Sequence, residues 1–254
     1  LSIAITTSDA SLISVGNITY TCSANTIYLS LTPSSNQSGY LSITVSVTDT
    51  GEQTSETSFG ITVNSINDLP QIGSISNQTI DEDTVSDAIN FTVTDVETAG
   101  CSHGVTFASS DITLIPVESI SYTCSSGIFY LSFTPSLNQS GITTITVTVS
   151  DDGLLTATSS FTLTITDTPD APVISSIENQ STLVNTTTSA INLTVTDVDA
   201  DDLTLTAFSS DTDIVAIENI SFSGTTANRT LTITPSTSVI GSLSITVIVS
   251  DSSG

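Results

Sequence analysis

The chain has 254 residues, of which 37% are hydrophobic, and it contains neither tryptophan nor methionine. Its 26 acidic residues are set against a single basic residue, Arg229, so the formal net charge is -25. A chain of this charge repels phosphate backbones and anionic lipid headgroups, which excludes nucleic acid as a partner. No apolar run approaches the roughly 18 residues of a membrane-spanning helix, so we expect this segment not to span a membrane.

The sequence repeats itself, and the repeats locate the expected elements along the chain. Residues 19–39 return as residues 121–141, so that Cys22 and Cys124 stand 102 residues apart. The segment 88–97 (AINFTVTDVE) likewise returns at 190–199 (AINLTVTDVD). The chain is therefore predicted to be a tandem array of similar units.

In chain order, residues 1–70 are predicted to form a first unit that lacks its opening two strands. Its end, the linker 64–70 (NSINDLP), combines polar turn formers with proline. Residues 71–172 form a complete unit that ends in a second linker, 166–172 (TDTPDAP). Residues 173–254 form a third unit that stops before its last strand. We expect the array to continue on both sides.

Each unit consists of short runs in which apolar residues alternate with threonine and serine. Residues 142–149 (ITTITVTV) and 161–165 (FTLTI) show the period of two that is typical of strands with one buried face. We expect Phe161, Leu163 and Ile165 to face the core and the intervening threonines to face outward. About seven such runs in roughly 100 residues favour an antiparallel two-sheet β-sandwich with almost no helix.

The cysteines indicate a disulfide. The complete unit contains Cys101 and Cys124, whereas the third unit has lost both and carries Gly224 in place of Cys124. This joint loss predicts a Cys101–Cys124 bond, the alternative being two small buried thiols. Cys22 corresponds to Cys124, and we expect its partner just before Leu1. A disulfide requires an oxidising compartment and would stabilise the unit by about 3 kcal/mol.

Acidic residues recur at three places in the unit: after the second strand, after the penultimate strand, and in the linker. In a sandwich these places converge at one pole, and hard oxygen ligands from several loops are typical of calcium sites. The alternative is a solvated acidic surface. The candidate metal ligands are Asn67, Asp68, Glu82, Asp95, Glu97, Asp151, Asp167, Asp170, Asp197, Asp199 and Asp251.

Together these motifs resemble those of the cadherin-like, immunoglobulin-like tandem repeats in large bacterial surface proteins and adhesins. The resemblance runs through essentially the whole chain. It is carried by Asp95-Val-Glu97 and Asp197-Val-Asp199, by Asp151-Asp152-Gly153, and by Asn67-Asp68-Leu69-Pro70. It implies immunoglobulin-like antiparallel β-sandwiches arranged as a rod, with Ca²⁺ held between successive domains.

The linkers depart from the family pattern. The family has an earlier aspartate and a middle asparagine, where this chain has Asn64 and Ile66 at one junction and Thr166 and Thr168 at the other. Glu82 is the expected substitute for acidic residues that the family places in the preceding domain. We therefore expect one or two ions per junction, with weak affinities of about 10⁻⁴ to 10⁻³ M.

The predicted function is an extracellular structural or adhesive repeat array, a calcium-stiffened spacer of a large surface protein rather than an enzyme. Its expected partners are other copies of itself, neighbouring repeats of the same chain, and cell-surface glycans or proteins. Two alternatives stay open. One is a subunit of a self-assembling extracellular filament or sheath, in which chains contact laterally through threonine-rich faces or add a strand to an open sheet edge. The other is a carbohydrate-binding module.

Overall fold

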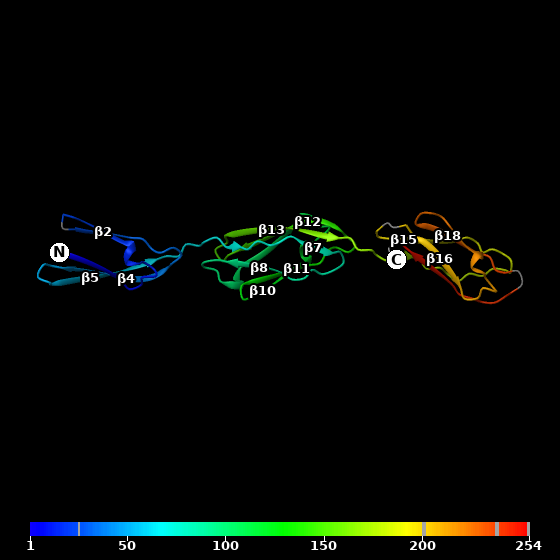
Figure 1. Cartoon of the computed structure of the whole chain (residues 1–254), viewed down its shortest axis with the longest axis horizontal. Coiled ribbons are helices and arrows are strands. Elements are labelled where there is room, and N and C mark those ends of the chain that lie inside the picture. Colours follow the sequence, from blue (N-terminus) through cyan, green and yellow to red (C-terminus); the bar gives the residue numbers. More distant parts are fainter. Residues whose placement is uncertain (25, 200–201, 237–238, 253–254) are drawn as a thin grey trace. The chain divides into compact units, whose positions relative to one another are not determined.

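The computed structural model describes residues 1–24, 26–199, 202–236 and 239–252. These residues form strands β1–β19 and four 3-10 helices of three residues each, η1–η4 (Figure 1). None of the helices in the described part is long or apolar enough to cross a membrane. The prediction of an all-β fold built from antiparallel sheets is confirmed, whereas the rod arrangement stays a prediction.

The strands are short and pair antiparallel. The first seven are β1 (Ser2–Thr7), β2 (Ile18–Ser23), β3 (Thr26–Leu31), β4 (Gly39–Thr48), β5 (Thr54–Val63), β6 (Gln71–Ile72) and β7 (Gln78–Asp81). The next six are β8 (Ile89–Thr94), β9 (Gly104–Ser109), β10 (Ile120–Ser125), β11 (Ile128–Phe133), β12 (Gly141–Ser150) and β13 (Thr156–Thr166). The last six are β14 (Val173–Ile174), β15 (Ile191–Thr196), β16 (Thr204–Ser209), β17 (Ile220–Ser223), β18 (Asn228–Ile233) and β19 (Ile245–Ser250). The helices are η1 (Val15–Asn17), η2 (Gly100–Ser102), η3 (Val117–Ser119) and η4 (Ile217–Asn219).

The sheets keep the same strand order from one part of the chain to the next. The complete pair of sheets has the orders β10-β11-β8-β6 and β7-β13-β12-β9. Farther along the chain, β14-β15-β18-β17 repeats the first order and β16-β19 repeats the pairing of β9 with β12. Towards the N-terminus, the described sheets are β1-β4-β5 and β2-β3. The sequence repeats therefore correspond to repeated sheet topology.

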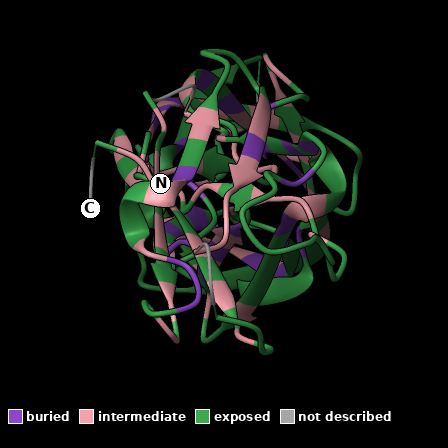
Figure 2. Ribbon diagram, turned by 90° about the vertical axis from the view of Figure 1, so that its right-hand side faces the viewer, coloured by how far each residue is buried: buried purple, intermediate pink, exposed green. Residues whose placement is uncertain are grey.

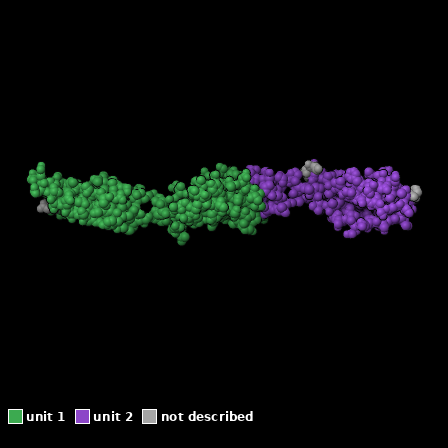
Figure 3. Space-filling model, turned by 90° about the horizontal axis from the view of Figure 1, so that it is seen from below, with its two compact units in different colours: residues 1–78, 85–134, 143–163 green, residues 79–84, 135–142, 164–254 purple. Residues whose placement is uncertain are grey.

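The described chain divides into two compact units (Figure 3). Unit 1 comprises Leu1–Gln78, Val85–Thr134 and Thr143–Leu163. Unit 2 comprises Thr79–Thr84, Pro135–Ile142 and the described residues of Thr164–Gly254.

Unit 1 contains apolar cores that the alternating strands build from one face each. Figure 2 colours the described chain by burial, with buried residues in purple and exposed residues in green. In its N-terminal part, the core residues are Leu12, Ile13, Ile18, Leu41, Ile43 and Val45. Farther along, aromatic contacts join the facing sheets: Phe107 of β9 lies 5.7 Å from Tyr122 of β10, and Phe133 of β11 lies 6.4 Å from Phe161 of β13, measured between ring centroids. These contacts make the two layers of a β-sandwich.

The predicted core face of β13 is confirmed. Phe161, Leu163 and Ile165 are all buried, and Thr162 and Thr164 between them are half-buried. In unit 2, strands β15 and β18 contribute the buried residues Leu193, Val195 and Leu231, which pack with Ile214 and Val215.

A recurring aspartate turn sets the entry to each core. The Oδ1 atom of Asp111 accepts hydrogen bonds from the backbone N–H groups of Thr113 (2.9 Å) and Leu114 (3.4 Å). Asp9 makes the same turn before Leu12 and Ile13, and Asp211 makes it before Ile214 and Val215. The turn follows the preceding strand, and the apolar side chains three and four positions after each aspartate are buried.

The predicted disulfide between Cys101 and Cys124 is present, with Cα atoms 5.7 Å apart. It joins η2, in the loop between β8 and β9, to β10. Cys22, the counterpart of Cys124 in the first repeat, is a free and exposed thiol in this chain.

Candidate metal centres

Ten of the eleven predicted ligands gather in two groups, each within one compact unit. The first cluster, in unit 1, comprises Asn67, Asp68, Asp95, Glu97 and Asp151. The second cluster, in unit 2, comprises Glu82, Asp167, Asp170, Asp197 and Asp199. The eleventh, Asp251, is half-buried directly after β19, and its role as the counterpart of Asp151 stays a prediction.

In the first cluster, the loop after β8 accepts hydrogen bonds from the linker. Oδ1 of Asp95 accepts hydrogen bonds from the backbone N–H groups of Glu97 (2.9 Å) and Thr98 (2.6 Å), which folds the loop back on itself. The Glu97 carboxylate then accepts from the N–H of Asp68 (3.0 Å) and from the hydroxyl of Ser65 (3.2 Å). The linker is thereby tied to the end of β8.

Asp151, after β12, completes the first cluster and is only 4% exposed. Its Oδ1 accepts a hydrogen bond from the N–H of Leu155 (2.9 Å), and its Oδ2 accepts one from Nδ2 of Asn67 (2.8 Å). Both oxygens of this buried carboxylate therefore have hydrogen-bond donors from the protein. Oδ2 of Asp95 differs, because it is buried and accepts no hydrogen bond from any residue that the structure describes.

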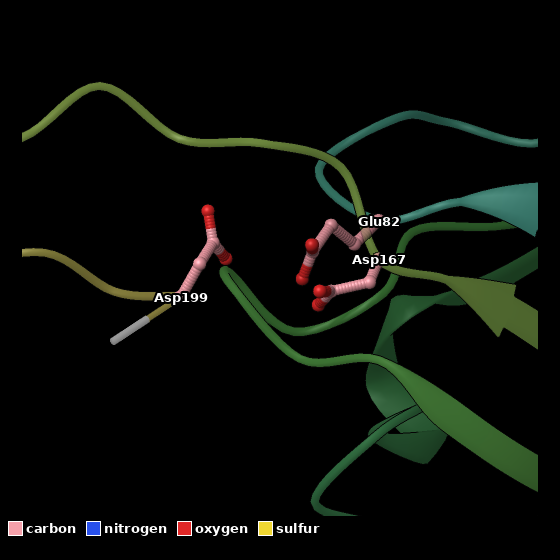
Figure 4. A group of neighbouring side chains, drawn as sticks. All are labelled: Glu82, Asp167 and Asp199. Carbon is pink, nitrogen blue, oxygen red and sulfur yellow. The ribbon is translucent and has the colours of Figure 1, made fainter. Parts of the chain in front are cut away.

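The second cluster brings carboxylates from three segments together (Figure 4). Oxygen atoms of Glu82, Asp167 and Asp199 all lie within 4.8 Å of one another. Glu82 follows β7, Asp167 directly follows β13, and Asp199 lies in the loop after β15. Of the acidic run Asp81-Glu82-Asp83, Glu82 is the buried member, at 2% exposure, and both neighbours are exposed.

Hydrogen bonds from two backbone N–H groups and one serine hydroxyl hold these carboxylates in place. Oε1 of Glu82 accepts from the N–H of Thr168 (2.9 Å), and Oδ1 of Asp167 accepts from the hydroxyl of Ser140 (2.9 Å). Oδ2 of Asp199 accepts from the N–H of Asp170 (2.7 Å). The protein's own hydrogen bonds thus hold the three carboxylates in position.

The two clusters share a local design. In both, the first acidic residue after the strand accepts from the backbone N–H of the second, as Asp95 does from Glu97 and Asp197 does from Asp199 (2.9 Å). The second acidic residue then accepts from the linker aspartate, 102 positions apart in the two copies. In the second cluster, Oδ2 of Asp170 and Oδ2 of Asp197 are buried and accept no hydrogen bond from the described residues.

Like charge and burial raise the pKa values of two carboxyls in the second cluster. At Glu82, the hydrogen bond from Thr168 lowers the pKa, but burial and the charges of Asp167, Asp83 and Asp170 outweigh it, so the pKa is raised. At Asp170, burial raises the pKa first, and the charges of Asp199, Asp83, Asp197 and Asp167 raise it further. The cluster contains no basic side chain among its described residues, and Arg229, the one basic residue of the sequence, donates to the carbonyls of Gly224 and Leu203. Carboxylates crowded in this way favour a hard divalent cation such as Ca²⁺.

Sequence reasoning missed the partners that orient the ligands. Ser65, Ser140 and the N–H of Thr168 each bind a cluster carboxylate, and the buried Thr98 accepts a hydrogen bond from the N–H of Asp152 (3.2 Å). Of these residues, Ser140 could have been noticed from the sequence, because it belongs to the repeated Asn-Gln-Ser-Gly segment.

The chain was compared with known proteins. Residues 169–254 match the family model described as a bacterial Ig domain, and no curated protein matches the sequence. Among solved structures, the chain is similar to protocadherin gamma B2 extracellular cadherin domains 1–5, at 17% identity and a TM-score of 0.43, covering 98% of this chain and 49% of that one. It is also similar to the human desmocollin-1 ectodomain, at 11% identity and a TM-score of 0.38, covering 99% of this chain and 49% of that one.

The chain thus spans about half the length of these two ectodomain structures. The bacterial Ig domain match includes the segment 190–199, which recurs at 88–97. Residues 169–254 therefore match a bacterial Ig domain, and the repeated strand pattern extends through the described chain before them.

Proposed function

We propose that this chain is part of an extracellular structural or adhesive repeat array in which the two acidic clusters bind Ca²⁺ and stiffen a spacer. The bacterial Ig domain match and the Cys101–Cys124 disulfide fit a surface or extracellular domain. Under this proposal the repeats are residues 1–70, 71–172 and 173–254. Their partners are neighbouring repeats, further copies, and cell-surface glycans or proteins.

The observation that carries the proposal is the pair of buried, unpartnered oxygens in the second cluster, Oδ2 of Asp170 and Oδ2 of Asp197. A buried carboxylate oxygen without a donor or a counterion is costly, and native structures avoid it. Basic side chains cannot meet this need, because the sequence has only Arg229, which donates to backbone carbonyls elsewhere. A calcium ion would supply the missing positive charge.

The chain's own residues do the positioning. Because Glu82, Asp167 and Asp199 are each fixed by a hydrogen bond from outside the carboxylate group, little conformational freedom is lost when they become ligands. Binding a common ion would then fasten the loop after β7, the segment after β13 and the loop after β15 to one another.

The two clusters should differ in affinity. In the first, Asp151 is already satisfied by Asn67 and Leu155, and only Oδ2 of Asp95 is left without a partner. In the second, two oxygens lack partners and three carboxylates converge. We therefore expect the second cluster to bind calcium more tightly than the first.

A calcium titration followed by the melting temperature tests the proposal. The wild-type chain should gain thermal stability with a midpoint of about 10⁻⁴ to 10⁻³ M calcium. The variant Asp197→Asn keeps the shape but removes one ligand charge, and its midpoint should rise at least about tenfold. Asp152→Asn, which changes an exposed aspartate outside both clusters, is the matched control and should titrate like the wild type.

Two outcomes would count against the proposal. The first is a melting temperature that does not respond to calcium up to about 10 mM, above the weak extracellular range. The second is an equal shift of the midpoint in Asp197→Asn and Asp152→Asn, which would indicate general charge screening rather than a site.

A further inference from the structure

The disulfide of the middle repeat has no covalent counterpart in the third, although the surrounding strands are the same. Phe129 of β11 pairs with Phe91 of β8, and the matching strands pair Arg229 of β18 with Leu193 of β15. On the other side of these strands, Tyr122 pairs with Leu131, and Phe222 pairs with Leu231. Arg229 therefore occupies the position of Phe129, next to the position of the disulfide.

The exchanged residues differ greatly in character. Phe129 is fully buried and stacks on Phe91, with ring centroids 5.3 Å apart, and it also lies 6.2 Å from the ring of Tyr122. Arg229 at the same position is half-buried and is the only basic residue of the chain. An arginine can pack its aliphatic stem against apolar neighbours and still direct its guanidinium to polar groups.

The guanidinium reaches the same two segments that the disulfide joins in the middle repeat. Nη1 of Arg229 donates to the carbonyl oxygen of Gly224 (2.5 Å), and Nη2 donates to the carbonyl oxygen of Leu203 (3.4 Å). Gly224 stands in the place of Cys124, directly after β17. Leu203 lies in the loop between β15 and β16, which corresponds to the loop that contains Cys101.

The backbone at Gly224 explains why no cysteine stands there. Its φ is +93°, a conformation that side chains disfavour, and an added Cβ would meet the carbonyl oxygen of Asn228 at 2.5 Å. β17 accordingly ends at Ser223, whereas β10 continues to Ser125, one residue past Cys124. The third repeat thus has a backbone that is incompatible with the disulfide and a carbonyl that accepts from Arg229.

We propose that Arg229 is a non-covalent, redox-insensitive replacement for the disulfide. It fastens the β15–β16 loop to the end of β17 as the Cys101–Cys124 bond fastens the β8–β9 loop to β10. A reductant should therefore loosen this fastening in the middle repeat and leave it intact in the third. The proposal does not depend on calcium binding.

Hydrogen–deuterium exchange of the 254-residue chain, read by mass spectrometry after alkylation of Cys22, tests both the effect of a reductant on the middle repeat and the role of Arg229 in the third. In the wild type, a thiol-free reductant should raise exchange in segments 101–108 and 120–125, with segments 202–208 and 220–224 unchanged. Arg229→Lys keeps the positive charge but loses the guanidinium, whose two Nη atoms donate to two carbonyls. This variant should raise exchange in segments 202–208 and 220–224 by about tenfold without reductant.

Asn228→Ala, which alters the exposed neighbour of Arg229, is the control and should leave both third-repeat segments as in the wild type. The proposal is overturned if Arg229→Lys matches this control, because the guanidinium then fastens nothing. It is equally overturned if reductant raises exchange in the third-repeat segments of the wild type as much as in the middle repeat. The reductant experiment uses the wild type, so it still tests the proposal if the Arg229→Lys variant fails to fold.

Discussion

Carboxylates in this chain occur in two opposite electrostatic settings. In the aspartate turns, hydrogen bonds stabilise the ionised form: the Ser11 hydroxyl and the backbone N–H groups of Leu12 and Ser11 lower the pKa of Asp9. The Thr113 hydroxyl and N–H do the same for the pKa of Asp111. In the second cluster, burial and neighbouring acids favour the protonated form instead. The response of stability to pH should therefore change sign with the pH range.

Without calcium, lowering the pH from 7 towards the ordinary carboxyl pKa of about 4 should raise the melting temperature. The raised pKa values of Glu82 and Asp170 mean that the folded state binds protons more readily than the unfolded chain. Their stabilising effect is complete below the unfolded pKa values of about 4 and is lost as the pH rises through the raised, folded values. Thermal melts in a chelating buffer at several pH values measure this.

Two comparisons identify the source of this pH effect. Glu82→Gln, which removes the titrating group, should flatten the rise, and saturating calcium should do so as well. A melting temperature that falls steadily from pH 7 to about pH 4 in the chelating buffer would contradict the assignment. Below about pH 4 the sign should reverse, because the turn aspartates with lowered pKa values then become protonated and lose their stabilising hydrogen bonds.

At the residue scale, the sequence indicated which acids to consider but not how they are held. The spacing in Asp95-Val-Glu97 and Asp197-Val-Asp199 recurs with the repeat, so it could be found by self-comparison. The contact between Thr168 and Glu82 joins positions 86 residues apart in the chain, and that between Ser140 and Asp167 joins positions 27 apart. Such pairs depend on tertiary packing, which a single sequence does not record.

At the level of the strands, the sequence predicts which residues of a strand share a face, but it does not predict how deeply that face is buried. Phe161 of β13 is 3% exposed, whereas its counterpart Phe59 of β5 is 39% exposed. The two strands have similar patterns, but β13 lies between β7 and β12, while β5 is paired only with β4 among the described strands. Burial depends on the neighbouring strands as well as on the pattern of the strand itself.

The buried face of β11 should be the most sensitive place in the middle repeat. Phe129→Ala removes a fully buried ring that stacks on Phe91 and should cost about 3–5 kcal/mol of unfolding free energy. Calorimetric unfolding of the whole chain should show one component move to lower temperature while the others stay.

Ile128→Ala, at the exposed start of the same strand, is the matched control and should cost about 1 kcal/mol or less. If both substitutions have the same small effect, the aromatic stack does not stabilise the middle repeat as described.

At the scale of the whole molecule, the chain carries many negative charges and almost no positive ones. A formal net charge of -25 opposes compact packing through self-repulsion, and a single arginine cannot offset it. The two acidic clusters concentrate this charge in the linkers and the loops that contact them. Divalent cations would relieve the repulsion at the segments that connect one repeat to the next. The mechanical state of the array would then depend on calcium.

Small-angle X-ray scattering of the 254-residue chain, at fixed ionic strength with and without calcium, tests whether calcium stiffens the array. We expect calcium to narrow the distribution of interatomic distances within the particle, because linkers held by an ion sample fewer arrangements. Asp197→Asn should require more calcium for the same change. Identical scattering profiles with a chelator and with about 10 mM calcium, well above the weak extracellular affinity range, would contradict the calcium-stiffened spacer.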